Sequence, residues 1–192
     1  MNRVIFLDKD GTIVDNSAYD VLRRTVGAAA KLNREAIPTN QLISGLDEGL
    51  RTLARTNYKI IIVSNQSHIA RGVFTQEETE EIFEQLQRNV QAVGGRIDAW
   101  YYCPHDDIDA CRCRKPLPGL LERAVREHGI SLQGSFIIGD SPADINLGKR
   151  VGLTTALVRT GQGAHYFQNP KNPQPDYVFA DLNEAARILF AR

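Results

Sequence analysis

Two carboxylates two residues apart, Asp8 and Asp10, are the residues whose types and spacing most directly suggest chemistry. One carboxylate of such a pair can act as a nucleophile while its neighbour transfers protons. The pair would repel an incoming phosphate unless a cation lay between them, and Asp140 and Asp144 can supply further oxygen ligands for magnesium. Gly11 permits a tight turn whose backbone N–H groups could bind phosphate oxygens. Because Asp and Gly also occur together in ordinary turns, the pair alone leaves a structural role open.

A second cluster of potential ligands comes from Cys103, His105, Cys111 and Cys113. Three thiols and one imidazole are the donor set of a closed, tetrahedral structural zinc site. The spacing C-x-H…C-x-C differs from that of common zinc fingers, and three incidental cysteines in a loop are the alternative. Because these four donors leave no open coordination position, we expect the zinc to be structural and to staple the loop of residues 103–116.

Short apolar runs that each end at polar residues predict buried strands of a parallel sheet. These runs cover residues 4–7, 59–63, 99–102, 135–138 and 155–158. Between and after them, helical spacing of apolar residues predicts helices over residues 45–55, 75–93, 118–128, 141–151 and 183–192. This alternation predicts an α/β doubly wound parallel sheet with helices on both faces and ligands at the carboxyl ends of its strands. Residues 17–44 are expected to form a loop with a short helix and residues 160–176 a surface loop, neither with obvious chemistry.

The composition is that of an ordinary globular protein, with 42% hydrophobic and 24% charged residues in 192. We expect a single domain over residues 1–192, with an insertion at about 17–44 and no large cap domain. The 23 basic and 23 acidic residues cancel, which favours neither nucleic acid nor an anionic membrane as a partner. No apolar run is long enough to cross a bilayer. The acidic residue Asp8 comes too early in the chain for the apolar region of a secretory signal. We therefore expect a cytoplasmic protein, acting as a monomer.

Four motifs, each at or just beyond the end of a predicted strand, make the sequence resemble the haloacid dehalogenase (HAD) superfamily of aspartate-nucleophile phosphotransferases. In chain order they are Asp8-Lys9-Asp10-Gly11-Thr12, Ser64-Asn65-Gln66-Ser67, Arg114-Lys115-Pro116 and Gly139-Asp140-Ser141-Pro142-Ala143-Asp144. The resemblance implies a Rossmann-like HAD fold. It also implies a magnesium-dependent phosphatase that acts through an aspartyl-phosphate intermediate.

The resemblance also implies a role for each catalytic residue. Asp8 would attack phosphorus, while Asp10 would protonate the leaving oxygen and then activate water. Ser64 would donate a hydrogen bond to the phosphoryl group, and Lys115 would place a positive charge beside it; both serve a reaction that needs positioning and charge neutralisation. The magnesium ligands would be the Asp8 carboxylate, the Asp10 backbone carbonyl and Asp140, with Asp144 either a further ligand or a partner of the ligands.

The cysteine-rich loop makes the sequence similar to the histidinol-phosphatase-like branch of the superfamily, which includes phosphatases of D-glycero-D-manno-heptose 1,7-bisphosphate and of histidinol phosphate. Residues 69–75 and 157–161 resemble motifs of the heptose phosphatases, and this resemblance implies removal of the C7 phosphate of the heptose; histidinol phosphate is the alternative substrate. The balanced charge disfavours a polynucleotide 3′-phosphatase. A non-enzymatic binding domain on the same fold is the alternative of a different class. The expected substrate contacts are Asn16, Tyr19, Ser64, Asn65, Gln66, Ser67, Arg114 and Lys115, of which Arg114 could pair with a second phosphate.

Overall fold

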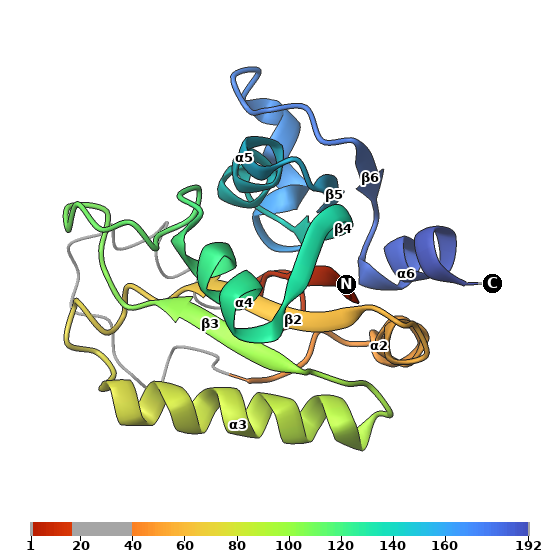
Figure 1. Ribbon diagram of the computed structural model, residues 1–192, viewed down its shortest axis with the longest axis horizontal. Coiled ribbons are helices and arrows are strands. Elements are labelled where there is room, and N and C mark those ends of the chain that lie inside the picture. Colours follow the sequence, from red (N-terminus) through yellow and green to blue (C-terminus); the bar gives the residue numbers. More distant parts are fainter. Residues whose placement is uncertain (1, 17–39, 192) are drawn as a thin grey trace.

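The computed structural model describes residues 2–16 and 40–191. Within these residues, six parallel strands form one sheet in the order β3-β2-β1-β4-β5-β6 (Figure 1). The strands are β1 (Asn2–Leu7), β2 (Lys59–Asn65), β3 (Ala99–Cys103), β4 (Ile130–Gly139), β5 (Thr154–Val158) and β6 (Tyr177–Phe179). The helices are α2 (Asp47–Ala54), α3 (Gln76–Ala92), α4 (Gly119–His128), α5 (Pro142–Val151) and α6 (Leu182–Phe190), with a 3₁₀ segment, η2 (Gly161–Gln168). The chain starts at the centre of the sheet and winds outward in both directions, so the predicted doubly wound fold is confirmed.

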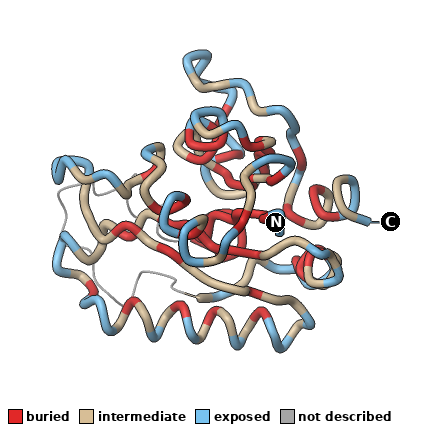
Figure 2. The backbone as a smooth tube through the Cα atoms, in the orientation of Figure 1, coloured by how far each residue is buried: buried red, intermediate tan, exposed pale blue. Residues whose placement is uncertain are grey.

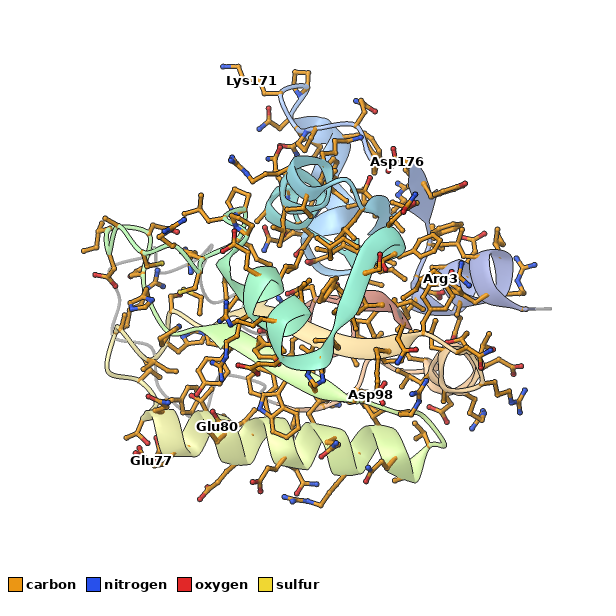
Figure 3. All side chains as sticks on the ribbon, viewed as in Figure 1. Arg3, Glu77, Glu80, Asp98, Lys171 and Asp176 are labelled. Atoms are coloured by element: carbon orange, nitrogen blue, oxygen red, sulfur yellow. The ribbon has the colours of Figure 1, made fainter. Side chains whose placement is uncertain are left out.

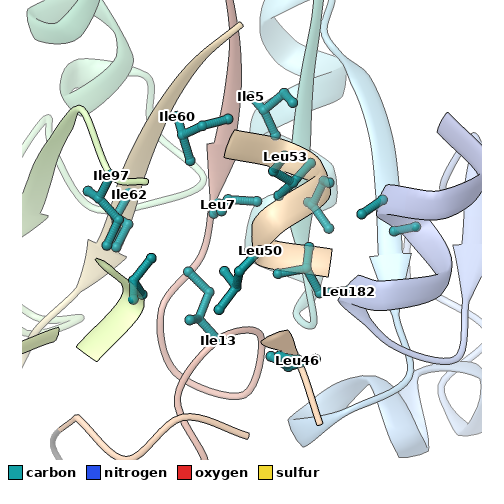
Figure 4. Packing of buried hydrophobic residues seen from close by; sticks show 14 of the residues in the cluster. Ile5, Leu7, Ile13, Leu46, Leu50, Leu53, Ile60, Ile62, Ile97 and Leu182 are labelled. Carbon is teal, nitrogen blue, oxygen red and sulfur yellow. The ribbon is translucent and has the colours of Figure 1, made fainter. Parts of the chain in front are cut away.

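The central strand β1 is buried on both faces (Figure 2). Ile5 and Leu7 belong to a core cluster shared with α2, α3 and α6, part of which is seen in Figure 4. Val4 and Phe6, which alternate with them, belong to a second cluster shared with α4 and α5. Side chains of a strand point alternately to its two faces, so helices must cover both faces of this sheet. The strand that ends at Asp8 is therefore held rigidly from both sides.

Local capping signals fix the ends of the helices nearest the site. Thr75 and Glu78 form a reciprocal capping box at the start of α3. Helix α4 ends at Gly129, whose φ of 59° lies in the left-handed region that glycine favours. Helix α5 begins with a second capping box, made by Ser141 and Asp144. The start of α5 is thereby fixed directly after β4, where the fourth motif lies.

The edge strand β3 is held against α3 by aromatic and polar contacts. Glu80 of α3 accepts hydrogen bonds from Trp100 Nε1 at 3.0 Å and from the Tyr102 hydroxyl at 2.7 Å (Figure 3). The ring of Phe83 stacks on both aromatic rings, with centroids 6.0 and 5.4 Å away. These contacts anchor the strand that leads into the cysteine-rich loop.

Three parts of the fold differ from the prediction. The prediction of a surface loop over residues 160–176 was wrong for η2, because Gly163 and Tyr166 in this segment are buried. Tyr166 packs with Ile145 and Leu157, so one aromatic side chain anchors this Gly- and Gln-rich segment to the hydrophobic interior. Strand β6 was not predicted, because it is only three residues long and two of these residues are exposed. Strand β4 also extends further toward its start than the predicted residues 135–138.

The two ends of the predicted insertion lie side by side. The Asp15 N–H donates to the Gln41 carbonyl and the Ile43 N–H donates to the Ile13 carbonyl, each at 2.9 Å. Residues 17–39, including most of the predicted loop and short helix, lie outside the described residues. The single domain over residues 1–192 stays a prediction. Among residues 2–16 and 40–191, no helix combines the length and apolar character that crossing a bilayer requires.

Candidate active site

The predicted catalytic residues meet at the carboxyl ends of three neighbouring strands. Asp8 follows β1, Ser64 lies near the end of β2, and Asp140 follows β4. Strand β1 lies between β2 and β4, which is the point where the sheet begins to wind in opposite directions (Figure 1). Doubly wound sheets bind their ligands at such a switch point. Here the strand ends line a cavity of about 420 Å³, a size that suits a small molecule.

Apart from Asp144 and the zinc ligands, every predicted site residue that the structure describes lines this one cavity. These residues are Asp8, Asp10, Asn16, Ser64, Asn65, Gln66, Ser67, Arg114, Lys115 and Asp140. Tyr19, also predicted to contact the substrate, lies outside the described residues. The catalytic and substrate-binding roles of the lining residues stay predictions, but their meeting in one cavity is what those roles require.

Lys115 is buried between two carboxylates. Its Nζ donates to Asp8 Oδ1 at 2.5 Å, to Asp144 Oδ1 at 2.7 Å and to the Val63 carbonyl at 2.8 Å. Burial opposes its charge, but the carboxylates of Asp144 and Asp8 outweigh that effect and raise the pKa of Lys115. The second oxygen of Asp144 accepts from the N–H and hydroxyl of Ser141. Both oxygens of Asp144 are thus engaged by protein donors, and Lys115 is held as a cation against Asp8.

The carboxylates of Asp8, Asp140 and Asp144 form a cluster whose ligand oxygens lie within 4.8 Å of one another. Burial raises the pKa of Asp8 to about 7. The positive charge of Lys115 lowers this pKa, but not enough to offset burial and the nearby carboxylates, which raise it. Burial, followed by the charges of Asp8 and Asp144, also raises the pKa of Asp140. When ionised, the three carboxylates carry more negative charge than Lys115 can neutralise, so the cluster offers a binding site for a further cation.

Asp140 has one oxygen held by the protein and one without a donor. Its Oδ2 accepts from the Gln162 N–H at 2.7 Å, whereas its buried Oδ1 has no hydrogen-bond partner among the described residues. A Cβ atom at Gly11 or Gly161 would lie 2.2 Å from Oδ2, and both glycines have positive φ. Only glycine at these positions allows so close an approach. Sequence reasoning missed Gln162; the motif at residues 157–161, which ends beside it, was the signal that could have found it.

Both oxygens of Asp10 accept hydrogen bonds from buried side chains. Lys9 Nζ donates to Oδ1 at 2.5 Å, and Gln66 Nε2 donates to Oδ2 at 2.7 Å. Gln66 Nε2 also donates to Ser64 Oγ at 2.8 Å. Lys9 lies over the ring of Phe83 at 5.9 Å, which fixes its ammonium group from the other side. The carboxylate predicted to move protons is therefore held in one orientation.

The side chain of Asn65 ties the third motif to the end of β2. Its Oδ1 accepts from the Lys115 N–H at 3.0 Å, and its Nδ2 donates to the Lys115 carbonyl at 3.1 Å. This reciprocal pair fixes the backbone from which the Lys115 side chain reaches Asp8. Asn65 was predicted as a substrate contact, and in the structure both ends of its amide are engaged with the protein.

Two arginines at the cavity are held by aspartates of the cysteine-rich loop. Arg114 Nε donates to Asp107 Oδ1 at 2.6 Å, and Arg114 Nη1 donates to the His105 carbonyl at 3.2 Å. Arg71 makes a bidentate pair with Asp106, at 2.7 and 2.8 Å. Sequence reasoning gave Arg71 no separate role, because its partner lies 35 residues further along the chain. The conformation of this loop therefore decides where two positive charges lie.

The predicted zinc ligands come together. The ligand atoms of Cys103, His105, Cys111 and Cys113 all lie within 4.8 Å of one another. Cys103 Sγ lies 3.6 Å from Cys111 Sγ and 3.2 Å from Cys113 Sγ, close to the roughly 3.8 Å that separates two sulfurs on a tetrahedral zinc ion. Burial raises the pKa of Cys103, and a metal ion bound by its sulfur would favour the thiolate. The arrangement fits a closed Cys₃His metal site.

Known proteins similar to this chain match it over almost its whole length. A HAD-hydrolase-like family model matches residues 112–185. The D-glycero-beta-D-manno-heptose-1,7-bisphosphate 7-phosphatase of Pseudomonas putida is 33% identical over 189 residues, which cover 97% of this chain and 99% of that relative. The protein of the same name from Pasteurella multocida is 34% identical over 196 residues, covering 98% and 97%.

A solved structure has the same fold. The D,D-heptose 1,7-bisphosphate phosphatase from B. bronchiseptica, crystallised with magnesium and phosphate, matches with a TM-score of 0.81 and 28% identity. The match covers 97% of each chain. The similarity therefore extends over nearly the whole chain and is not confined to one part of the sheet.

Proposed function

Because the chain belongs to the D-glycero-D-manno-heptose-1,7-bisphosphate 7-phosphatase family of HAD-like hydrolases, we propose that it removes the C7 phosphate of D-glycero-D-manno-heptose 1,7-bisphosphate. The chain is a phosphatase, which hydrolyses a phosphate monoester. The observation that carries the proposal is the convergence of Asp8, Asp10, Lys115 and Asp140 in one cavity of about 420 Å³. That cavity is large enough for a phosphorylated sugar.

The reaction we propose has two steps that share one nucleophile. An oxygen of Asp8 attacks phosphorus, the bond between phosphorus and the C7 oxygen breaks, and Asp10 gives its proton to that oxygen. Asp10 then takes a proton from water, whose oxygen attacks the phosphorus of the aspartyl-phosphate and restores Asp8 with release of inorganic phosphate. Ser64 donates to the phosphoryl oxygens and Lys115 neutralises their charge.

Magnesium fits the carboxylate cluster, and a structural neighbour was crystallised with it. The buried Asp140 Oδ1 lacks a hydrogen-bond donor among the described residues, and Asp8 offers its carboxylate nearby. Hard oxygen ligands of this kind are those that magnesium prefers. We propose that Asp8, Asp140 and the Asp10 backbone carbonyl hold the ion. When bound, it neutralises the phosphoryl group and favours the ionised form of Asp8.

We also propose that the Cys₃His cluster holds a structural zinc ion. The cluster lies in the same loop as Asp106 and Asp107, which hold Arg71 and Arg114 at the cavity. Zinc would thus fix two positive charges on the substrate side of the site. Of these, Arg114 is the group we propose for the second phosphate of the substrate, since a guanidinium can bind phosphate in a bidentate manner.

His105→Ala is expected to lose bound zinc and to lower kcat/KM for a bisphosphate substrate by at least about 10-fold, because the arginines lose their support. Zinc content by atomic emission, limited proteolysis of residues 103–116 and phosphate release are the measurements. His165→Ala serves as the matched control, since His165 is exposed and outside the cluster. A zinc-free His105→Ala protein with unchanged proteolysis and kinetics would show that the ion does not support the site.

The substrate proposal is tested by phosphate release with magnesium. Both anomers of heptose 1,7-bisphosphate and histidinol phosphate are compared at equal concentration. We expect kcat/KM for one heptose anomer to exceed that for histidinol phosphate by at least about 100-fold, or about 2.7 kcal/mol in transition-state binding. Phosphorus NMR should show loss of the C7 phosphate only, and chelation of magnesium should abolish the activity. A preference for histidinol phosphate would overturn the proposed substrate and leave the proposed chemistry intact.

A further inference from the structure

Gln66 is a buried side chain that contacts two catalytic groups at once. Its Nε2 donates to Asp10 Oδ2 at 2.7 Å and to Ser64 Oγ at 2.8 Å. Its backbone is fixed as well, because its N–H donates to the Cys103 carbonyl at 2.8 Å. Only 6% of the residue is exposed, although it lines the cavity. The amide therefore has little freedom to turn away from either partner.

An amide nitrogen carries two hydrogens that diverge by roughly 120°. In Gln66 each hydrogen has an acceptor, so the group bridges Asp10 and Ser64 without a donor left for a substrate. Because Ser64 Oγ accepts from Gln66, its own hydrogen must point to another acceptor. The hydroxyl is thereby prepared to donate to a phosphoryl oxygen in the cavity.

Asp10 is constrained from two sides. Lys9 holds Oδ1 and Gln66 holds Oδ2, while about a third of the Asp10 side chain faces the cavity. Each carboxylate oxygen has two lone pairs, so one hydrogen bond leaves a second lone pair free to bind the proton that Asp10 transfers. Lys9 alone would leave the carboxylate able to rotate about the Oδ1 contact, because a single contact does not define its plane. Gln66 supplies the second fixed point.

We propose that Gln66 is a positioning residue that sets Asp10 for proton transfer and Ser64 for binding of the phosphoryl group, and not a donor to the substrate as its place in the second motif suggested. This inference rests on the proposed phosphatase reaction. It predicts that Gln66 acts on kcat far more than on KM. It also predicts an effect that depends on how basic the leaving group is, since only a basic leaving group needs the proton of Asp10.

The test is Gln66→Met, which keeps the length of the side chain and removes both donors. Heptose 1,7-bisphosphate has an alkoxide leaving group that needs protonation, whereas p-nitrophenyl phosphate releases a weakly basic phenolate. Since kcat/KM covers the steps up to release of the alcohol, it isolates the transfer in which Asp10 acts as an acid. We expect kcat/KM to fall at least about 100-fold for the sugar phosphate and less than about 10-fold for the aryl phosphate. KM for the sugar phosphate should stay within about twofold.

The Ser64 contact is tested separately in a Ser64→Ala background. In that background, Gln66→Met should not lower kcat/KM for the aryl phosphate any further, because the contact through Ser64 is already absent. Gln87→Met is the matched control: its Nε2 donates to the Ile97 carbonyl at 3.1 Å, and Gln87 does not line the cavity. Its kinetics should equal those of the wild type, and circular dichroism checks the fold of all variants.

Equal losses on both substrates, or a loss confined to KM, would overturn the positioning role. A wild-type enzyme that prefers a different alkyl phosphate would overturn the proposed substrate alone. The ratio of alkyl to aryl phosphate hydrolysis measured on that preferred substrate then decides the role of Gln66. The two proposals thus fail on different measurements.

Discussion

Asp8→Asn is expected to fold and to lose at least about 10⁴-fold in kcat/KM, because an amide cannot form the aspartyl-phosphate. The fold should survive, since the substitution keeps the shape of the side chain. Burial already raises the pKa of Asp8 to about 7, so the ionised carboxylate gains little stability from its surroundings. Lys115 also keeps its contacts with Asp144 and the Val63 carbonyl. Phosphate release measures the loss, and thermal unfolding checks the fold.

Asp10→Asn is the informative comparison for this prediction. It retains the nucleophile but lacks the base that activates water, so p-nitrophenyl phosphate should leave it covalently phosphorylated. Intact-protein mass spectrometry after rapid acid quench detects that species. In Asp8→Asn the phosphorylated form should not be detected under the same conditions. Turnover of Asp8→Asn near the wild-type rate, or a phosphorylated residue other than Asp8, would rule out the covalent scheme.

Lys115→Met is expected to lower the free energy of unfolding by about 3–5 kcal/mol, the usual cost of removing one partner from a buried ion pair. The substitution leaves the buried carboxylates of Asp8 and Asp144 without their shared donor. The Val63 carbonyl loses its hydrogen bond with Nζ as well. Phosphate release should also fall sharply, because the phosphoryl charge is no longer neutralised from this side. Urea unfolding without added magnesium measures the stability.

Lys59→Met is the matched control for stability. Lys59 pairs with Asp98, labelled in Figure 3, at 3.6 Å and is more than a third exposed. A long ion pair whose lysine is this exposed contributes at most about 1 kcal/mol. Adding Asp144→Asn to Lys115→Met should recover part of the lost stability, because it removes one uncompensated charge. Similar small losses in both lysine variants would show that the buried pairs contribute little to the fold.

Much of the fold was predictable because its signals are local. The apolar runs before Asp8, Ser64 and Asp140 predict strands without knowledge of their neighbours. The caps at Thr75 and Gly129 likewise depend on a few adjacent residues. Strand β6 and η2 escaped prediction because a strand of three residues with one buried side chain, Phe179, and a short segment with a single buried aromatic side chain, Tyr166, leave almost no periodic pattern.

The meeting of the four motifs follows from the sequence for a physical reason. Parallel strands place their carboxyl ends at one edge of the sheet, so residues that follow buried strands converge there. Asp8, Asp10 and Asp140 could therefore be assigned to one site before any coordinates, and the cysteine loop could be identified from its donor types. The resemblance to HAD enzymes supplied the roles of these residues.

Only the tertiary structure decided which side chains form hydrogen bonds and ion pairs with one another. The contacts of Lys115 with Asp8 and Asp144 span 107 and 29 residues, and that of Gln66 with Asp10 spans 56. Such contacts depend on the path of the intervening loops and on side-chain rotamers, and neither leaves a periodic signal in the sequence. The sequence by itself determined which groups gather at the end of the sheet. The packed structure determined how they are oriented, because buried polar groups must find partners wherever the fold places them.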